Sequence, residues 1–497
     1  MAFLSESSLR APILPSLRSG KEPQRARTRA GARGRLTAAA ADPIDDLVIP
    51  AADGKVVRPS DAEFNTLLPF NLRTTVRPAV IAQCRTPQGV ALALQWARQH
   101  GFALCGHGGG HSYEGFSSCS GIMIDVRKMD AVVIDTANKT ARVGAGSLLG
   151  DIAEKLFVKK LALPAGTCKP VGIAGLALGG GHGLSSRKFG LTTDNLLSAQ
   201  IVVASGTILT ASPTMNPELY WALRGGGGGN FGIVTEFTFK VHPVNRVIAF
   251  RIVWPNNYPT SALREWQKFA LNAPDELGFV LVMSGSQGSI TGIRCSGLYH
   301  PVTASQTPTV SKLRSLLNPL LSFGNPTFTT RQFTYIEAAR HFAGNGDPSR
   351  VYFKGKSDYA IGGLNPAGIS TFISSLRNSA APVAGIFEAY GGAINRIPEA
   401  DTAFPHRGKY PFLSAVLRRV VLQFRDESEG RGGPRLVCRH AALSSRIFLR
   451  QLHRPGPAQL CCRLLQGKPA PLAGGEATIR SRQRLPLRAK HSAAAVS

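Results

Sequence analysis

Residues 105–115 read Cys-Gly-His-Gly-Gly-Gly-His-Ser-Tyr-Glu-Gly, and this stretch decides the fold. The apolar run at residues 101–105 leads into it and predicts a buried strand. The glycines at 108–110 let the backbone turn tightly and direct several N–H groups toward one point. Such a turn suits a pyrophosphate, with His111 beside the reactive part of a bound ligand. The alternative is a glycine-rich turn carrying an ordinary surface histidine.

Two later stretches are also rich in glycine. Residues 164–190 read Pro-Ala-Gly-Thr-Cys-Lys-Pro-Val-Gly-Ile-Ala-Gly-Leu-Ala-Leu-Gly-Gly-Gly-His-Gly-Leu-Ser-Ser-Arg-Lys-Phe-Gly. Residues 216–234 read Asn-Pro-Glu-Leu-Tyr-Trp-Ala-Leu-Arg-Gly-Gly-Gly-Gly-Gly-Asn-Phe-Gly-Ile-Val. Seven glycines over residues 164–183 leave few side chains for a core, so we expect an extended passage whose backbone presses on a large flat ligand. An isoalloxazine ring with its ribityl chain has that shape.

These three ordered motifs resemble those of the berberine-bridge-enzyme-like oxidases, flavoproteins with the p-cresol methylhydroxylase / vanillyl-alcohol oxidase fold. The resemblance covers about residues 60–410. It implies an α+β fold, with a two-subdomain FAD-binding domain over residues 60–243. A substrate domain over residues 244–410 then follows, an antiparallel sheet facing the flavin with helices behind it. The resemblance also implies FAD bonded twice, through His111 to the 8α-methyl group and through Cys168 to C6.

The resemblance places further residues around the cofactor. Val171 stands where the family controls oxygen access, and valine there is similar to the oxygen-using members, which implies O2 as acceptor and H2O2 as by-product. His107 and Lys169 depart from the family, which usually has arginine and frequently proline at these positions, so one expected flavin contact is weakened. The other expected cofactor-binding residues are Gly108, Gly109, Gly110, Ser112, Gly172, Gly175, Gly181, His182, Gly183, Gly232 and Ile233.

The resemblance does not assign the group that removes a proton from the substrate. The family uses a residue of a Gln-Tyr-x-x-x-Trp strand or the tyrosine of Val-Asn-Tyr, and both segments are missing here. The remaining candidates are Tyr113, Glu388 and Tyr390. Glu388 and Tyr390 share one face of a predicted strand, although an ordinary strand face is the alternative. His182 is expected to pack in the flavin loop rather than to act as a base.

The implied reaction is oxidation of an alcohol, sugar or phenolic small molecule by hydride transfer to the covalent flavin. The protein supplies geometry and electrostatics, and the cofactor supplies the redox chemistry. Fold analogy does not name the substrate. The Gly-Ala-Gly-Ser-Leu-Leu-Gly stretch at residues 144–150 looks faintly like a dinucleotide fingerprint. It lacks the downstream ribose-binding acid of a βαβ unit, which argues against a Rossmann domain.

Local patterns predict individual elements along the chain. A helix over residues 86–98 begins with Thr86 as cap and Pro87 in the first turn, and Gly101 ends it. Further helices are predicted over residues 149–157, 216–225, 261–271, 308–317 and 368–377. Strands are predicted over residues 122–125, 131–135, 139–143, 231–241, 247–254, 279–283, 289–295 and 383–392.

The composition points to few other classes of protein. The 58 Lys+Arg residues against 30 Asp+Glu give a formal charge of +28, which would normally suggest a nucleic-acid partner. The arginines crowd the two ends of the chain rather than one face, so we expect no such partner. No run of about 18 apolar residues predicts a transmembrane segment. The eight cysteines have no zinc spacing, so no metal site is expected.

Residues 1–45 form a basic N-terminal segment without a secretory-type apolar core. This composition suits a transit peptide for a plastid or another organelle, and a disordered basic tail is the alternative. Plant members of the family usually carry a secretory signal. Secreted and cytoplasmic locations therefore stay open.

After Tyr410 the resemblance stops, and residues 411–497 are expected to be a disordered, aberrant tail. Read one base late, the codons for residues 415–421 permit Gln-Tyr-x-x-x-Trp, and those for residues 448–455 permit Ser-Phe-Val-Asn-Tyr-Ile-Asp. The family pattern then reappears in order. We interpret the tail as the product of a frameshift near residues 409–412. The alternative function is accordingly a non-catalytic flavin-binding or misfolded product.

Overall fold

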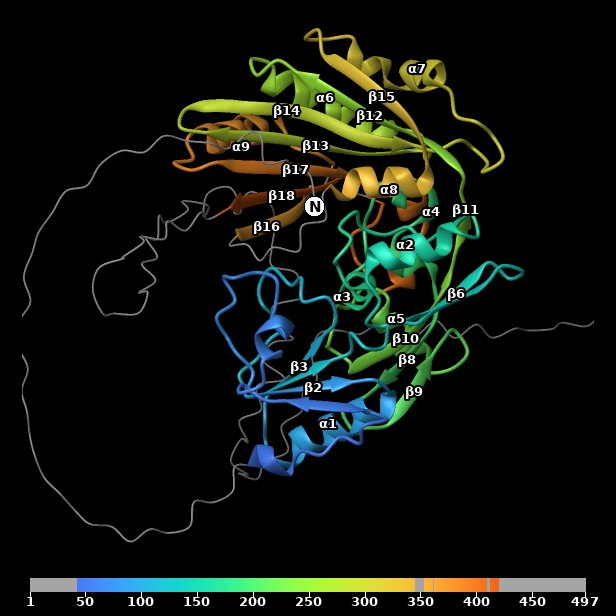
Figure 1. Cartoon of the computed structure of the whole chain (residues 1–497). Coiled ribbons are helices and arrows are strands. Elements are labelled where there is room, and N and C mark those ends of the chain that lie inside the picture. Colours follow the sequence, from blue (N-terminus) through green and yellow to red (C-terminus); the bar gives the residue numbers. More distant parts are fainter. Residues whose placement is uncertain (1–42, 345–352, 361, 409–411, 420–497) are drawn as a thin grey trace, which may run out of the picture. The chain divides into compact units, whose positions relative to one another are not determined.

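Two sheets form the N-terminal half of the chain, of which the computed structural model describes residues 43–344, 353–360, 362–408 and 412–419 (Figure 1). The first sheet has the order β1-β2-β4-β3, with β1 antiparallel to β2 and the other pairs parallel. Its strands are β1 (Gly54–Val57), β2 (Val80–Cys84), β3 (Leu104–His107) and β4 (Ile122–Asp125). A strand thus precedes the glycine turn as predicted, but β3 begins three residues later than expected and is only partly buried over residues 104–106.

The second sheet is antiparallel and has the order β5-β6-β10-β8-β9. Its strands are β5 (Val132–Asp135), β6 (Thr140–Gly144), β8 (Leu196–Val202), β9 (Ile208–Ala211) and β10 (Ile233–Lys240). The predicted pairing of residues 131–135 with residues 139–143 is confirmed by β5 and β6.

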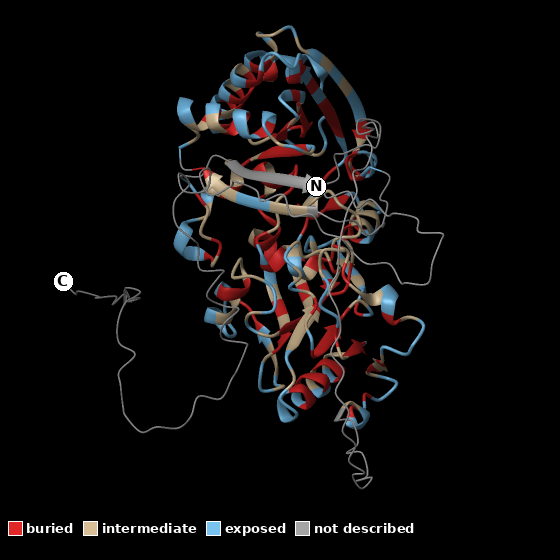
Figure 2. Ribbon diagram, turned by 90° about the vertical axis from the view of Figure 1, so that its left-hand side faces the viewer, coloured by how far each residue is buried: buried red, intermediate tan, exposed pale blue. Residues whose placement is uncertain are grey.

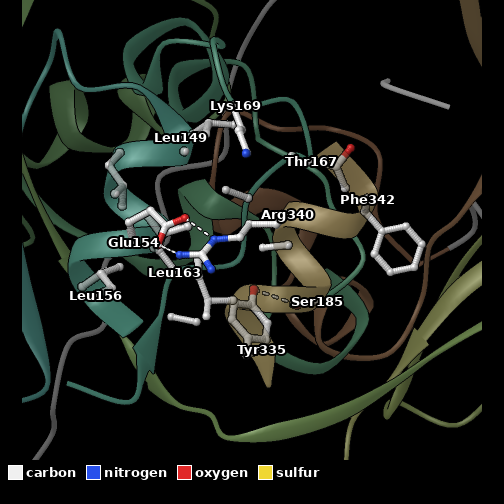
Figure 3. A pocket seen from close by; sticks show the side chains of 18 of the residues that line it. Leu149, Glu154, Leu156, Leu163, Thr167, Lys169, Ser185, Tyr335, Arg340 and Phe342 are labelled. Carbon is white, nitrogen blue, oxygen red and sulfur yellow. Dashed lines mark hydrogen bonds and ion pairs between the residues drawn. The ribbon is translucent and has the colours of Figure 1, made fainter. Parts of the chain in front are cut away.

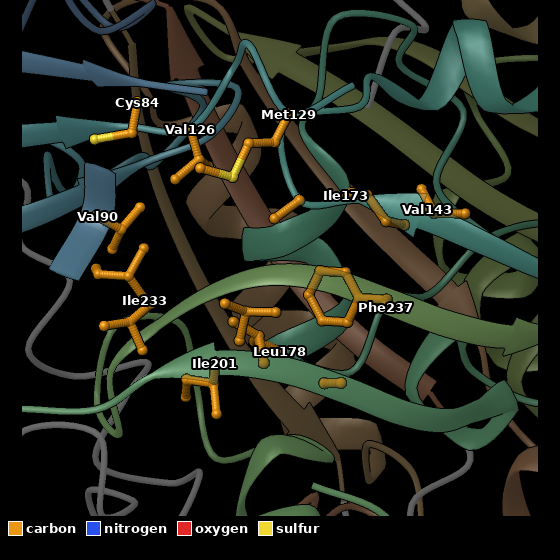
Figure 4. Close-up of a cluster of buried hydrophobic side chains, with 14 of the residues drawn as sticks. Cys84, Val90, Val126, Met129, Val143, Ile173, Leu178, Ile201, Ile233 and Phe237 are labelled. Carbon is orange, nitrogen blue, oxygen red and sulfur yellow. The ribbon is translucent and has the colours of Figure 1, made fainter. Parts of the chain in front are cut away.

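Helix α1 (Pro87–Gln99) begins where the local signals predict. The Thr86 hydroxyl accepts a hydrogen bond from the Gly89 N–H at 3.1 Å, which satisfies one of the free amides of the first turn. Its buried residues belong to one core shared by both sheets (Figure 4). This core explains why the first and second sheets form a single domain.

One predicted segment is wrong in its secondary structure. Residues 164–183 were expected to be extended, but they contain the short helix α3 (Ile173–Leu178). Gly172 and Gly179 lie just outside its ends, so Gly175 is the one glycine within it. Its apolar residues are buried in the shared core, and this burial outweighs the low helix propensity of the glycine.

The C-terminal half is a seven-stranded antiparallel sheet with the order β15-β12-β14-β13-β17-β18-β16. The strands are β12 (Arg246–Trp254), β13 (Leu277–Ser286), β14 (Ser289–Tyr299), β15 (Thr327–Thr334), β16 (Phe353–Ala360), β17 (Val383–Ala389) and β18 (Phe412–Arg419). The helices α6 (Pro259–Asn272), α7 (Val310–Leu321) and α9 (Pro366–Arg377) pack against it through a second hydrophobic core. Figure 2 shows exposed residues on the outer helix surfaces and buried residues toward the sheet.

The seven-stranded sheet extends past the boundary predicted at residue 410. Strand β18 pairs with β17 on one side and with β16 on the other. Backbone hydrogen bonds do not depend on side-chain identity, so a strand forms here although the family motif is missing. The rest of the predicted tail lies outside the described residues. So does nearly all of the predicted N-terminal segment, apart from the start of a 3-10 helix at Pro43–Asp46.

The remaining elements connect the two halves. They are α2 (Leu149–Phe157), β7 (Leu161–Ala162), α4 (Ser186–Phe189), α5 (Pro217–Leu223), β11 (His242–Pro243), α8 (Tyr335–Ala343) and α10 (Ala393–Arg396). Asn216 precedes α5 as predicted, but its side chain donates to the Thr210 carbonyl instead of capping the helix. Among the described residues, no helix has the length and apolarity needed to cross a membrane.

Candidate active site

The first two glycine-rich stretches touch through their backbones. A Cβ atom on Gly109 would lie 2.2 Å from the Gly172 nitrogen, and one on Gly172 would lie 2.3 Å from the Gly109 nitrogen. A side chain at either position would therefore clash with backbone that cannot move aside. This contact places the turn that carries His111 beside the loop that carries Cys168.

The His111 imidazole is half-buried and stacks on the Phe70 ring, with 4.4 Å between the ring centroids. Burial and the neighbouring His107 lower the pKa of His111 to about 4. The imidazole is therefore neutral near pH 7, and one ring nitrogen keeps a free lone pair. That is the form a histidine needs to act as a nucleophile.

His107 supports the turn from below. Its Nδ1 lies 2.9 Å from the Ser117 carbonyl oxygen, which only accepts, so Nδ1 carries the proton. Its Nε2 is buried without a hydrogen-bond partner within the described structure. A Cβ on Gly110 would lie 3.0 Å from that Nε2, and Gly110 has a φ of 70°. His107 thus fills the space beside Gly110, where the family usually has an arginine.

The loop around Cys168 is fixed to helix α2. The Cys168 carbonyl accepts from the Val171 N–H at 3.3 Å, and the Val171 carbonyl accepts from the Leu149 N–H at 3.0 Å. Cys168 is a half-buried free thiol. A Cβ on Gly175 would meet no atom within 4 Å, so an exposed glycine surface lies three residues beyond the Gly109–Gly172 contact. A large flat group fits such a surface.

Other predicted cofactor-binding residues have partners within the protein. Cβ atoms on Gly181, Gly183 and Gly232 would meet Thr192, the Ala165 carbonyl and the Val202 carbonyl within 2.4 Å, so packing alone explains these glycines. Ser112 accepts a hydrogen bond from the Phe116 N–H at 3.0 Å and shapes the turn. A Cβ on Gly106 would lie 2.9 Å from the side chain of Ile233.

His182, Glu388 and Tyr390 meet where the glycine loops approach strand β17. The His182 Nδ1 atom lies 3.1 Å from the Glu388 Oε2 atom, and its Nε2 lies 3.3 Å from the Ala389 carbonyl oxygen. The His182 ring also stacks on the Tyr390 ring, with centroids 4.7 Å apart and planes 9° from parallel. Glu388 and Tyr390 thus lie on a common side, as their spacing predicts, and His182 has a charged partner that sequence reasoning missed.

The charge of Glu388 depends on this contact. Burial raises the pKa of the Glu388 carboxyl, but the hydrogen bond and charge of His182 outweigh burial and hold that pKa below its ordinary value. Its side chain is 22% exposed, so the carboxylate is accessible to a small molecule. A carboxylate that stays ionised and partly exposed can accept a proton.

Tyr113 lies within electrostatic reach of both Cys168 and Glu388. Burial raises the pKa of the Tyr113 phenol most, and the charges at Cys168 and Glu388 raise it further. The Tyr113 carbonyl is held by Arg73 at 2.8 Å and by Asn71 at 3.1 Å. Tyr113 therefore connects the His111 turn with strand β17, and its phenol keeps its proton near pH 7.

Tyr390 is buried and forms a phenol pair that was not predicted. Its hydroxyl oxygen lies 3.1 Å from that of Tyr359 on strand β16, and the Tyr359 ring stacks on His406 with centroids 3.7 Å apart. Burial raises the pKa of both phenols. Tyr390 is 2% exposed, so it supports the site from behind rather than facing a substrate. No local pattern signals Tyr359, because β16 reaches β17 only through β18.

Comparison with known proteins identifies the family. Residues 78–212 match the model of an FAD binding domain. The chain is 34% identical over 363 residues to the uncharacterized FAD-linked oxidoreductase YgaK of Bacillus subtilis, covering 71% of this chain and 78% of that protein. The solved structure of BBE-like 1 from Physcomitrella patens is 32% identical, with a TM-score of 0.67 over 74% of this chain and 82% of that one. The chain belongs to the berberine-bridge-enzyme-like FAD-linked oxidoreductases.

For another structural relative of this berberine-bridge-enzyme-like chain, the linkages between protein and flavin are known. Glucooligosaccharide oxidase from Acremonium strictum is 26% identical, with a TM-score of 0.69 over 76% of this chain and 81% of that one. The description of that structure names a 6-S-cysteinyl, 8α-N1-histidyl FAD. The predicted family, fold class and enzyme class of this chain are thus confirmed.

Buried arginines join the two halves of this oxidoreductase. Arg187 is 2% exposed and donates to the carbonyls of Tyr390 and Ala273, while burial lowers its pKa to about 10. Arg407 binds both carboxylate oxygens of Asp194, at 2.6 and 3.1 Å. These contacts fix the end of β17 against the loop that follows His182.

A separate cavity of about 70 Å³ lies between α2 and α8 (Figure 3). Apolar side chains form most of its lining, and the Glu154–Arg340 ion pair lies beside it. Thr167 and Lys169 also line it, so it reaches the back of the Cys168 loop. Among the described residues, no cluster of three or more histidine, cysteine or acidic side chains could hold a metal ion.

Proposed function

We propose that this chain carries FAD bonded to both His111 and Cys168 and oxidises a hydroxyl-bearing carbon of a carbohydrate, with O2 as the final acceptor. The observation that carries the proposal is the contact of the Glu388 carboxylate on strand β17 with His182, within electrostatic reach of Tyr113 on the His111 turn. Such a reaction requires a bound flavin and a group that accepts the substrate proton.

Cofactor attachment at His111 and Cys168 is supported by their chemical state. The lowered pKa of His111 keeps its imidazole neutral, and Cys168 is a half-buried thiol that is not paired in a disulfide. The backbone contact between Gly109 and Gly172 holds both loops in place before any ligand binds. The relative from Acremonium strictum, whose flavin has both linkages, supports the same arrangement.

The proposed reaction balances with Glu388 as the proton acceptor. The substrate carbon loses a hydrogen with two electrons, its hydroxyl loses a proton, and the overall products are a carbonyl compound and H2O2. FAD, when bound, supplies the two-electron acceptor. Glu388 takes the hydroxyl proton, while Tyr113 and Tyr390 stay protonated because burial raises the pKa of each phenol.

A carbohydrate is the favoured substrate class because the Acremonium strictum relative is an oligosaccharide oxidase. Simple alcohols and phenols remain the competing classes. The flavin itself does not select among these substrate classes. Substrate specificity therefore depends on side chains of the substrate sheet.

The experiment measures H2O2 release from the flavin-loaded chain with glucose-, xylose- and N-acetylglucosamine-based oligosaccharides and with aromatic alcohols. We expect turnover with at least one oligosaccharide. Glu388→Gln should then lower kcat about 100-fold or more, since a positioned base contributes that much. His100→Gln, at the exposed end of α1, serves as the matched control. Equal kcat values for Glu388→Gln and the wild type would exclude Glu388 as the base.

The second candidate is a flavin-binding product without turnover. It is favoured by one specific observation, the absence of the Val-Asn-Tyr segment that supplies a tyrosine in the family. Colour that stays in the acid-precipitated protein, together with no reduction of the bound flavin by any compound tested, would support this candidate instead.

A further inference from the structure

Both ring nitrogens of His182 face oxygen atoms that accept hydrogen bonds. Nδ1 lies 3.1 Å from the Glu388 carboxylate, and Nε2 lies 3.3 Å from the Ala389 carbonyl oxygen. A neutral imidazole has one N–H and can satisfy only one acceptor, whereas an imidazolium has two. The two contacts therefore fit either an imidazolium with a carboxylate or a neutral imidazole with a protonated Glu388.

The chemistry of the two groups decides between these forms. The ordinary pKa of a histidine side chain is about two units higher than that of a glutamate side chain. The side chains of His182 and Glu388 are 12% and 22% exposed, so the pair is not so deeply buried that neutralisation must follow.

We propose that His182 is a positioning residue that carries the proton of a His182–Glu388 ion pair and thereby keeps Glu388 a carboxylate aimed at the substrate. This inference rests on the proposed function of Glu388 as the base. It assigns a charge to a residue that sequence reasoning placed in flavin-loop packing.

The surroundings of the pair supply no competing charge among the described residues that face it. Tyr390 stacks on His182, and Tyr113 and Tyr359 are the other phenols within electrostatic reach of Glu388. All three keep their protons, because burial raises the pKa of each phenol. Arg407, which acts on Tyr390, is bound to Asp194, and Cys168 acts on Tyr113.

The fold fixes His182 independently of Glu388. Gly180 and Gly181 have φ values of 115° and 79°, a conformation that favours glycine. Their carbonyls accept from the Thr193 and Thr192 N–H groups at 2.9 Å each. In the proposed pair, the FAD-binding domain thus presents the imidazolium and the substrate domain presents the carboxylate.

The first test measures the protonation of His182 without turnover. The full flavin-loaded chain is labelled with ¹⁵N-histidine, and the ring nitrogen shifts are recorded by NMR at pH 7.5, with His182→Gln used to assign the signal. We expect two protonated nitrogens for His182 in the wild type and one in Glu388→Gln, with the His100 signal unchanged. A neutral His182 ring in the wild type would overturn the proposal.

The second test separates the charge of His182 from its packing. His182→Gln can still donate to Glu388 but has no charge, His182→Phe keeps the stacking on Tyr390, and His182→Lys restores a cation. We measure the rate of flavin reduction by substrate against pH. At low pH the rate falls as Glu388 becomes protonated. This acidic limb of the profile should move to higher pH by about one unit or more in His182→Gln and His182→Phe, because burial then raises the pKa of Glu388 without opposition from His182. The acidic limb should return toward its wild-type position in His182→Lys.

Packing alone predicts the opposite order. If His182 only supports Tyr390, His182→Phe should match the wild type and His182→Lys should be the poorest variant, with no shift of the acidic limb; this result would overturn the proposal. If no compound reduces the wild-type flavin, the proposed function fails. The NMR result still decides the charge of the pair in that case.

Discussion

Hydrogen-bonding partners set the charge of Asp125, a buried carboxyl that pairs with His107 across strands β3 and β4. Asp125 has no exposed side-chain surface, and it binds Arg127 through both carboxylate oxygens at 2.8 and 3.0 Å. It also accepts from Gln83 at 3.3 Å. Burial raises the pKa of the Asp125 carboxyl, but the hydrogen bonds and charge of Arg127 outweigh it, and the net pKa lies below its ordinary value.

Asp125→Asn should lower the free energy of unfolding by about 3 kcal/mol near pH 7, because it leaves Arg127 without its partner. The lowered folded-state pKa means that Asp125 stabilises the fold above its unfolded pKa of about 3.9, and this contribution is lost as the pH falls through the folded value. Urea unfolding at pH 7 and pH 3 measures the difference. The difference in unfolding free energy between Asp125→Asn and the wild type should be smaller at pH 3 than at pH 7. Asp130→Asn, on the exposed surface, should not differ from the wild type at either pH.

Two side chains are proposed to share the attachment of one flavin, which gives the single variants a distinctive result. His111→Ala and Cys168→Ala should each retain yellow colour in the acid-precipitated protein through the other linkage. The double variant should release its flavin to the supernatant. Absorbance of pellet and supernatant measures this. Release by either single variant would show that one linkage, rather than two, holds the cofactor.

At the scale of elements, the glycines divide into those required by the fold and those open to a ligand. Gly172→Ala should destabilise the chain and lower its flavin content together, because the new Cβ would lie 2.3 Å from the Gly109 nitrogen. Gly175→Leu should fold like the wild type, since its Cβ meets nothing within 4 Å, but should bind less FAD. Thermal unfolding and flavin content after purification measure the two effects. Normal flavin content in Gly175→Leu would remove Gly175 from the cofactor surface.

Elements with local signals were predictable, and elements held by distant partners were not. Thr86 and Pro87 predict the start of α1, because the N-cap hydrogen bond and the first-turn proline involve residues within four positions of each other. Helix α3 was missed because its flanking glycines dominate the pattern, while its stability comes from a core built by other elements. The candidates His111, Cys168 and Glu388 came from motifs and resemblance. The contact of His182 with Ala389 joins residues 207 apart, and only the folded chain reveals it.

For the whole molecule, the C-terminal tail determines what should be expressed. We predict that the transcript contains a frame change near residues 409–412, and that restoring the family frame gives a more soluble protein with a sharper thermal transition. Sequencing the transcript tests the first statement, and comparing both proteins by size-exclusion chromatography and calorimetry tests the second. An uninterrupted frame, or a monodisperse and cooperatively unfolding original chain, would contradict them.

Strand β18 also imposes an order of assembly. Within the described sheet, β16 has β18 as its hydrogen-bonded neighbour and has no direct pairing with β17. Residues 353–360 are therefore synthesised well before the strand that seats them, and they must wait for residues 412–419 to leave the ribosome. Such non-local pairing is slow because a long loop must close first. The Tyr359–Tyr390 contact behind Glu388 is then among the last to form, so the site matures only after the substrate sheet is complete.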